Sequence, residues 1–248
     1  MRDYQKREKA ESEHFDQLAD ATGETWWGST TPAGVERLRR RGRLLATALS
    51  AFTDPFVVEL GCGTGAFSQY LLEQHPSLRL HGVDISVKAA SVAAERLQIY
   101  PHAVFQQGSA LALEYGDGSV DAVIGCSILH HLPMPEALTE AFRVLRPSGM
   151  LWFSEPNMMN PQILLEKNIR FIGKMLQNTE DETTFFRWSI GRQLVDTGFS
   201  HVAVRPFDFL HPIIPSRLVY VTTLIGLLLE KIPFAREFAG SLLIIAVK

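Results

Sequence analysis

A glycine-rich stretch, Glu59-Leu60-Gly61-Cys62-Gly63-Thr64-Gly65-Ala66, carries the strongest chemical signal in this 248-residue chain. It follows a short apolar run and precedes a helix-like segment, and its glycines let the backbone approach a ligand without a Cβ in the way. The helix that follows offers unpaired N–H groups at its start. Asp84 closes the next apolar run, 19 residues beyond Gly65, and a carboxylate there can bind ribose hydroxyls. These residue types predict a nucleoside-containing ligand at the carboxyl ends of neighbouring strands.

The segments around this motif alternate between strand and helix patterns. Five apolar runs are expected to form strands: Phe56–Leu60, Leu78–Val83, Ala103–Gln106, Ala122–Ile124 and Met150–Phe153. Helix-like stretches separate or flank them: Ala66–Gln74, Val87–Leu97 and Glu136–Leu145. Such alternation is typical of a parallel sheet that is covered by helices on both faces. The chain is therefore predicted to be a doubly wound α/β protein.

Both ends of the chain add elements to this core. Residues 1–53 are expected to form an N-terminal helical cap, with helices over residues 1–20 and from Gly34 to about Ser50, on a domain of residues 54–248. Helical insertions are expected at about 156–198 and 207–240. The first would hold helices at Pro161–Gln177 and Thr184–Thr197, the second of them closed by Gly198. Two further strands are predicted at His201–Pro206 and Ser241–Val247.

The glycine pattern alone leaves two kinds of cofactor open. Gly61-x-Gly63-x-x-Ala66 also fits the looser dinucleotide fingerprint, which would make the chain a nicotinamide-dependent oxidoreductase. Glu59 lies two residues before the first glycine, at the end of the strand. A carboxylate there would repel a pyrophosphate and attract an ammonium or sulfonium cation. The electrostatics favour a cationic cofactor over a dinucleotide.

Five motifs, in order, resemble those of the class I S-adenosylmethionine-dependent methyltransferases. The matching segments are Glu59–Gly65, Val83–Ser86, Asp117–Val123, Ser127–Leu132 with the "LHHL" pattern of the small-molecule branch, and Leu145–Leu151 before the fifth strand. The resemblance covers residues 55–156. It implies a Rossmann-like, mostly parallel seven-stranded sheet with helices on both faces and an antiparallel last strand, which Leu242–Val247 resembles. It also implies S-adenosylmethionine as cofactor and S-adenosylhomocysteine as product.

The resemblance further implies which residues bind the cofactor. Glu59 would lie near the methionine ammonium, Asp84 would bind both ribose hydroxyls, and the carbonyl of Cys126 would accept from the amino group. Ser109 stands where the family commonly has an acidic residue for the adenine amino group. The full set of implied cofactor residues is Glu59, Gly61, Cys62, Gly63, Gly65, Asp84, Ile85, Ser109, Ala110 and Cys126. Both cysteines are expected near the cleft through their backbone position rather than through thiol chemistry.

The acceptor is less well determined by the sequence. Methyl transfer chiefly needs the nucleophile held in line and water kept out, so no catalytic base is assigned. His130, His131 and Glu155 are candidates for a base if the acceptor is a hydroxyl or a protonated amine, and otherwise pack passively. The leading hypothesis is transfer to a small-molecule or lipid-like acceptor. The alternative from another class is a protein that binds S-adenosylmethionine without catalysis.

Composition and charge narrow the partners. The net charge of −3 disfavours nucleic acid, and the arginines of residues 37–43, with the i,i+4 pair Glu36–Arg40, suit an exposed helix. Two cysteines and an N-terminus unlike a signal peptide predict the cytoplasm, and His and Cys show no metal-ligand spacing. Leu218–Leu229 is uncharged but has only 12 residues, whereas a spanning helix needs about 20. It is expected to be a buried core or lid helix, or else a surface helix that makes peripheral membrane contact.

Overall fold

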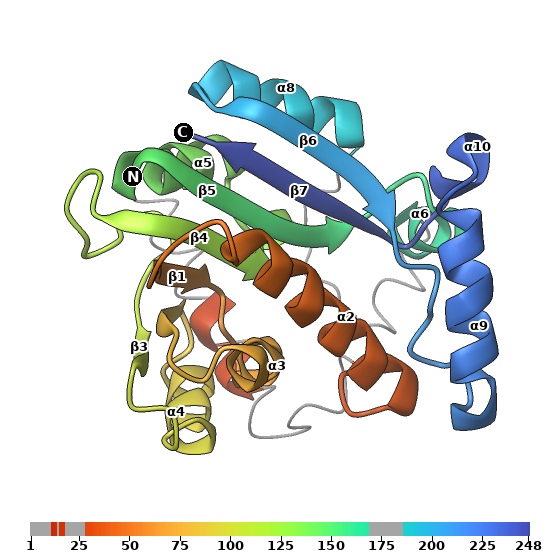
Figure 1. Cartoon of the computed structure of the whole chain (residues 1–248), viewed down its shortest axis with the longest axis horizontal. Coiled ribbons are helices and arrows are strands. Elements are labelled where there is room, and N and C mark those ends of the chain that lie inside the picture. Colours follow the sequence, from red (N-terminus) through yellow and green to blue (C-terminus); the bar gives the residue numbers. More distant parts are fainter. Residues whose placement is uncertain (1–10, 14, 18–27, 169–185) are drawn as a thin grey trace.

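The computed structural model describes residues 11–13, 15–17, 28–168 and 186–248. They form one sheet with helices on both faces (Figure 1). The strands are β1 (Phe56–Leu60), β2 (Arg79–Asp84), β3 (Ala103–Gln107), β4 (Val120–Cys126), β5 (Leu145–Pro156), β6 (Ser200–Phe207) and β7 (Ser241–Val247). The helices are α2 (Pro32–Leu49), α3 (Ala66–Gln74), α4 (Val87–Arg96), η2 (Leu129–His131), α5 (Met134–Val144), α6 (Pro161–Asn168), α8 (Arg187–Thr197), α9 (Ser216–Leu229) and α10 (Pro233–Arg236).

The seven strands run in the order β3-β2-β1-β4-β5-β7-β6. Neighbours from β3 to β5 are parallel, whereas β7 is antiparallel to both β5 and β6. The predicted fold class, with its reversed last strand, is confirmed. The chain leaves β1 toward β2 and β3 on one side and later returns to β4 on the other. The carboxyl ends of β1 and β4 therefore flank the topological switch point, where open α/β sheets bind ligands.

Two apolar cores lie on the two faces of the sheet. Adjacent strand residues point to opposite faces, so Val57 belongs to the core under α2 and α3, and Val58 to the core under α5 and α8. In the first core, Leu45 of α2 and Leu71 of α3 are fully buried. The two cores hold the strand ends rigidly in place, and this rigidity positions the loops that follow them.

Most predicted elements are present, and their boundaries have local causes. The helix expected from Gly34 starts at Pro32, because the hydroxyl of Thr31 accepts a hydrogen bond from the Gly34 N–H at 3.0 Å and proline suits the first turn. Gly198 closes α8 in the left-handed region with φ 112°, as predicted. The helices expected over residues 1–20 and Pro161–Gln177 lie partly outside the described residues.

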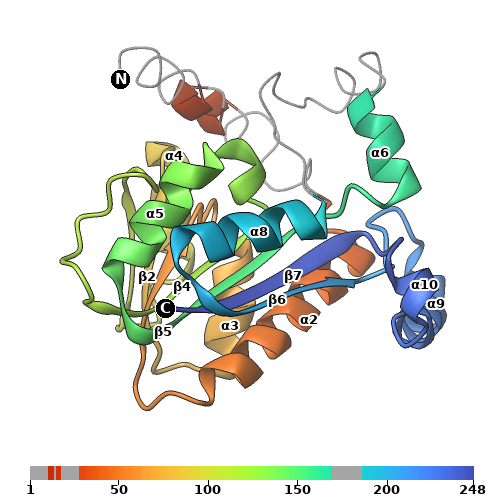
Figure 2. The same cartoon turned by 90° about the horizontal axis from the view of Figure 1, so that it is seen from above.

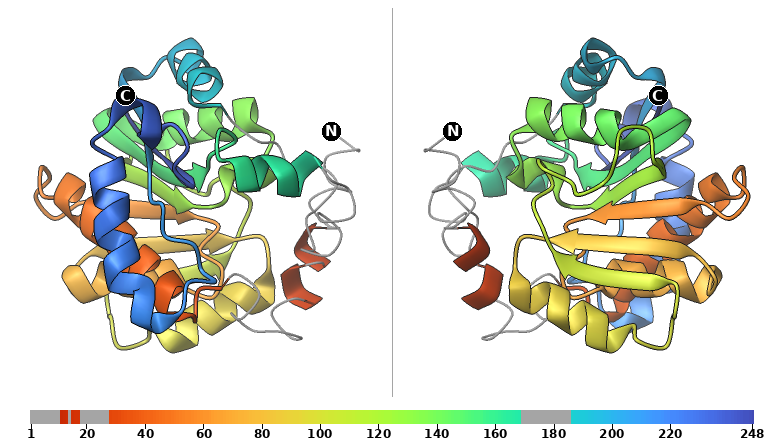
Figure 3. Two further views of the ribbon diagram at one scale, coloured as in Figure 1. Left: turned by 90° about the vertical axis from the view of Figure 1, so that its right-hand side faces the viewer. Right: turned by 90° about the vertical axis from the view of Figure 1, so that its left-hand side faces the viewer.

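The prediction that the 207–240 insertion contains a buried core helix is wrong. The insertion forms α9 and α10, which stand at one side of the molecule (Figures 2 and 3). Tyr220 is 73% exposed and Phe234 is 77% exposed. Thr223 and Gly226 of α9 line a small pocket together with Arg37 and Arg40 of α2, so the inner face of α9 is small and polar, and its large apolar side chains are left outside. Among the described residues, no helix is long and apolar enough to cross a bilayer.

Candidate active site

A cavity of about 250 Å³ opens at the carboxyl ends of the central strands. The loops after β1, β2, β3 and β4 all contribute to its walls, as expected for a site at the switch point. Eight of the ten predicted cofactor residues line it: Glu59, Gly61, Cys62, Gly63, Asp84, Ile85, Ala110 and Cys126. Gly65 and Ser109 are not among its lining residues. The structure thus brings together four loops that are far apart in the chain.

The glycines of the β1–α3 loop have distinct roles. Gly61 has φ 64°, and its N–H donates to the carbonyl of Val83 at 2.8 Å, which ties the loop to β2. Gly63 has φ 52°, and no atom lies within 4 Å of the place where a Cβ would stand, so its backbone is open to a ligand. Gly65 instead allows α3 to pack closely against α4, because a Cβ there would lie 2.9 Å from Leu97 Cδ1.

Asp84 joins this loop to the end of β2. Its Oδ2 accepts the N–H of Gly63 at 2.7 Å, and its Oδ1 accepts the N–H of Ser86 at 2.9 Å. Burial raises the pKa of Asp84, although these two hydrogen bonds oppose the shift. Each carboxylate oxygen has a further lone pair, so the group can accept from a vicinal diol while it holds the loop. The arrangement fits a ribose.

Glu59 lies at the base of the cavity and is almost fully buried. The hydroxyl of Ser68 donates to its Oε2 at 2.5 Å. Burial raises the pKa of Glu59 to about 8, against the opposing effect of that hydrogen bond. The group is therefore largely protonated at neutral pH, and a ligand cation beside it would favour the ionised form. This environment fits an ammonium group.

The loop after β3 departs from the expected adenine contact. Gly108 and Ala110 line the cavity, but the hydroxyl of Ser109 accepts the N–H of Leu111 at 3.2 Å and shapes the turn. The family pattern commonly has an acidic residue at this position, and the hydroxyl of Ser109 does not supply its negative charge. Ala110 leaves backbone, rather than a side-chain carboxylate, at this end of the cavity.

Known proteins share both the sequence pattern and the fold. The family description "Methyltransferase domain" matches residues 58–153. The erythromycin 3''-O-methyltransferase of Saccharopolyspora erythraea is 30% identical over 186 residues, which cover 70% of this chain and 60% of that protein. The ubiquinone biosynthesis O-methyltransferase of Paraburkholderia xenovorans is 32% identical over 142 residues, which cover 54% of this chain and 60% of that protein. The matches thus span 60% of the length of each relative.

A solved structure has the same fold over nearly the whole chain. The S-adenosylmethionine-dependent methyltransferase of Thermotoga maritima, described as a possible histamine N-methyltransferase, superimposes with a TM-score of 0.67 over 96% of this chain and 99% of that chain. Its 18% identity supports the fold alone. Residues 58–153 are a class I S-adenosylmethionine-dependent methyltransferase domain. The cofactor of this family is S-adenosylmethionine.

Both cysteines of the chain line the cavity. Cys62 and Cys126 are both free, and burial raises the pKa of each thiol. The charges of Asp84 and Glu59 raise the pKa of Cys62 further. Because the thiolate is the reactive form, neither side chain is suited to act as a nucleophile. Both residues contribute through position, as the sequence predicts.

Only one of the three candidate bases reaches the cavity. Glu155 is buried, and its Oε1 accepts the N–H groups of Ile128 and Leu129, each at 2.9 Å. Its Oε2 lies 2.8 Å from Nδ1 of His130. Glu155 and His130 therefore hold the turn after β4, while His131 lines the cavity itself. The ring of His131 meets the edge of Phe15 at 5.5 Å between centroids.

Residues near the N-terminus cover part of the cavity, in the region where the sequence analysis expects a helical cap, although it names none of them as site residues. Glu11 and Phe15 are lining residues. The hydroxyl of Ser12 donates to the carbonyl of Ile85 at 3.1 Å, and the hydroxyl of Ser86 donates to Asp16 at 2.5 Å. Figure 3 shows these helical residues beside the sheet. No local motif marks them, because their partners lie about 70 positions away.

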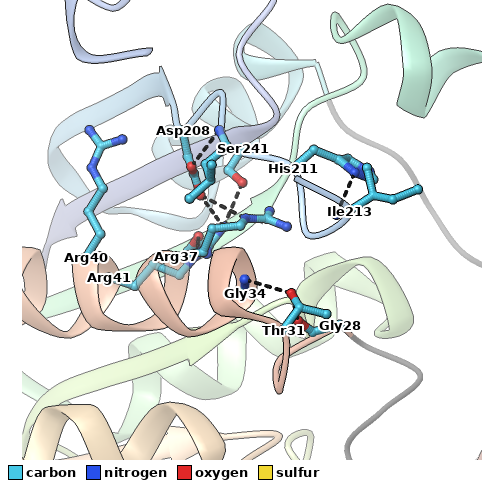
Figure 4. Close-up of polar contacts among 12 residues, drawn as sticks. Gly28, Thr31, Gly34, Arg37, Arg40, Arg41, Asp208, His211, Ile213 and Ser241 are labelled. Atoms are coloured by element: carbon cyan, nitrogen blue, oxygen red, sulfur yellow. Dashed lines mark hydrogen bonds and ion pairs between the residues drawn. The ribbon is translucent and has the colours of Figure 1, made fainter. Parts of the chain in front are cut away.

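Helix α2, which belongs to the same expected N-terminal cap, supplies a second wall of the cavity. Arg37 and Arg41 both line the cavity, although the arginine-rich segment was expected to be an exposed helix. The expected Glu36–Arg40 pair is absent, since Arg40 pairs with Glu230 and Glu36 pairs with Arg43. Figure 4 shows Arg37 and Arg41 reaching from α2 toward Asp208 and Ser241. Apart from Glu36, the partners of these arginines lie more than 100 positions away in the chain, so helical spacing alone could not reveal them.

Proposed function

We propose that this chain catalyses S-adenosylmethionine-dependent methyl transfer to an apolar small-molecule or lipid-like acceptor. The observation that carries the proposal is that Asp84 and Glu59 line one cavity together with the open backbone of Gly63. S-adenosylmethionine supplies a methyl group already activated on a sulfonium. In this proposal Asp84 binds the ribose, Glu59 lies beside the ammonium, and Phe15 and α2 help to keep water from the reacting atoms.

The acceptor side of the cavity supports an apolar substrate. Its walls include Phe15, Leu38, Ile128 and Leu132, with His131 among them. Both curated relatives are named as O-methyltransferases, which supports an oxygen acceptor here. With such an acceptor, His131 is the one candidate base placed to meet the hydroxyl.

Calorimetry on the wild-type chain tests the proposal. We expect S-adenosylhomocysteine to bind with micromolar strength and NADH not to bind. The protein is then incubated with S-adenosylmethionine labelled in its methyl group and with an apolar cell extract. Label should move into the organic phase. Tight cofactor binding without labelled product would favour the non-catalytic alternative, and binding of NADH alone would contradict the proposal.

We also propose that α9 docks on an anionic lipid surface, so that the enzyme works in the cytoplasm at a membrane. The polarity of α9 is the reverse of that of an ordinary surface helix. Thr222, Thr223 and Gly226 face the protein, while its large apolar residues face outward. The exposed set is Leu218, Tyr220, Val221, Leu224, Ile225, Leu227 and Leu228. Exposed cations stand near both ends of the helix, Arg217 and Lys231. An apolar face flanked by cations suits a bilayer interface.

Vesicle sedimentation measures this docking. With anionic phosphatidylglycerol vesicles, we expect the double variant Ile225→Asp/Leu228→Asp to lose at least about tenfold in partitioning, because two large apolar side chains no longer enter the interface. The double variant Ile99→Asp/Val195→Asp is the matched control, since both residues are exposed elsewhere. Equal partitioning of wild type and the α9 variant would contradict lipid docking. A wild-type dimer that the α9 variant abolishes would assign the face to a second copy instead.

A further inference from the structure

Arg37 presents unused hydrogen-bond donors to the cavity. Its Nε donates to Oδ2 of Asp208 at 3.1 Å. In the part of the chain that the structure describes, its two terminal nitrogens make no hydrogen bond. The side chain is 22% exposed and lines the cavity. A guanidinium carries its donors in a planar fork that matches the two oxygens of a carboxylate.

Arg41, one turn further along α2, is by contrast held by the protein. Its Nε donates to the hydroxyl of Ser154 at 2.8 Å, and its Nη2 donates to the hydroxyl of Ser241 at 2.9 Å. The same Nη2 lies 3.1 Å from Oδ2 of Asp208. Its guanidinium also lies over the ring of Phe207, 5.6 Å from the centroid. Arg41 is therefore a fixed buried charge (Figure 4).

Charge at this end of the cavity is not balanced by the described residues. Arg40 forms a two-bond pair with Glu230, at 2.7 and 2.6 Å, which leaves Asp208 alone to serve both Arg37 and Arg41. Burial acts to raise the pKa of Asp208, but the charges of Arg41 and Arg37 outweigh it and hold the pKa below its ordinary value. Burial, and next the charge of Arg41, lower the pKa of Arg37. In these direct ion pairs two arginines thus share one carboxylate, and a buried charge is costly unless it is paired.

Asp208 is held in place firmly enough to define this geometry. It has φ 70°, an uncommon conformation for a residue other than glycine. Its N–H donates to Oε1 of Glu230 at 2.8 Å, and its carbonyl accepts the N–H of Gly240 at 2.8 Å. Strained positions that the surroundings fix in this way are concentrated at ligand sites.

We propose that Arg37, fixed beside Asp208 and Arg41, forms a subsite for a carboxylate at the α2 end of the cavity. The terminal nitrogens of Arg37 donate to the two carboxylate oxygens, and Arg41 acts as a positioning residue. This inference rests on the proposed function. Two molecules at that site can carry the carboxylate: the amino-acid part of the methyl donor, or the acceptor. The other carboxyl groups on the walls, Glu11, Glu59 and Asp84, come from other elements.

Calorimetry with Arg37→Gln tests the subsite. The variant keeps a polar side chain but removes the charge and the terminal fork, and Arg43→Gln is the matched control on the exposed side of the same helix. If the donor supplies the carboxylate, Arg37→Gln weakens S-adenosylhomocysteine about ten- to a hundredfold and leaves the decarboxylated analogue unchanged. If the acceptor supplies it, S-adenosylhomocysteine binds both proteins equally. Benzoate added to the S-adenosylhomocysteine-loaded protein then binds wild type more tightly than Arg37→Gln, by a similar factor.

Further outcomes separate this inference from the proposed function. Equal binding of all three probes to wild type and Arg37→Gln would overturn the subsite and leave methyl transfer intact. Failure of wild type to bind S-adenosylhomocysteine would remove the proposed function, and titration of benzoate into the ligand-free protein would still decide whether Arg37 binds a carboxylate. Arg37→Lys, which keeps the charge without the fork, should recover part of the lost affinity if the fold is intact. Thermal unfolding midpoints of all variants verify that they fold.

Discussion

Asp84→Ala weakens the binding of S-adenosylhomocysteine by about tenfold or more. The substitution removes the proposed acceptor for the ribose hydroxyls, and it also releases the N–H of Gly63, which Asp84 holds at 2.7 Å. Loss of charge-assisted hydrogen bonds at a largely buried site accounts for a change of this size. Isothermal titration calorimetry measures it directly.

Two controls make this result interpretable. Asp117→Ala removes an aspartate that is exposed and bonded to Arg143, so it should leave cofactor affinity unchanged. Asp84→Asn keeps one carbonyl acceptor and should fall between wild type and Asp84→Ala. Affinity of Asp84→Ala within threefold of wild type would contradict the placement of the ribose at this carboxylate.

Glu155→Ala destabilises the protein by about 3–5 kcal/mol, because it strips acceptors from a buried site. The N–H groups of Ile128 and Leu129 and the ring of His130 all lose their partner at once. Urea unfolding followed by circular dichroism gives the free energy of unfolding. The effect should appear without any cofactor present, since Glu155 is not among the residues that line the cavity.

The conservative variant separates a structural role from a catalytic one. Glu155→Gln keeps an acceptor for the two backbone N–H groups and should cost about 1–2 kcal/mol. A Glu155→Ala protein as stable as wild type would show that the turn after β4 is held by other contacts. A fully stable Glu155→Gln protein with no methyl transfer would instead return Glu155 to the list of candidate bases.

The fold, and the gathering of the proposed donor-binding loops at one edge of the sheet, follow closely from the sequence, because their signals are local. A strand, a glycine turn and a helix occupy consecutive residues, and each strand end brings its own loop to the switch point. The position of Asp84 after one apolar run therefore predicts that it ends a strand beside the glycine-rich loop, and the structure has it at the end of β2 on the cavity wall. Ser109 is the instructive exception, since family position alone did not reveal that its hydroxyl bonds within its own turn.

The acceptor side of the cavity depends on contacts that no local pattern encodes. Arg41 meets Ser154 and Ser241, which are 113 and 200 positions away in the chain. The helical period of the sequence indicates which face of α2 carries Arg41, but it does not indicate which segment covers that face. The same limit applies to α9, where an uncharged run predicts burial as readily as exposure. The close packing of Gly226 against Phe209 shows which side of α9 turns inward.

The residues that line the pocket begin earlier in the chain than the residues that form the sheet. The sheet begins at Phe56, yet Glu11 and Phe15 already belong to the cavity wall. A shortened protein that starts at α2 would keep all seven strands and both cores. It would nevertheless present a pocket without its outer cover, and any turnover by such a fragment would underestimate that of the 248-residue chain.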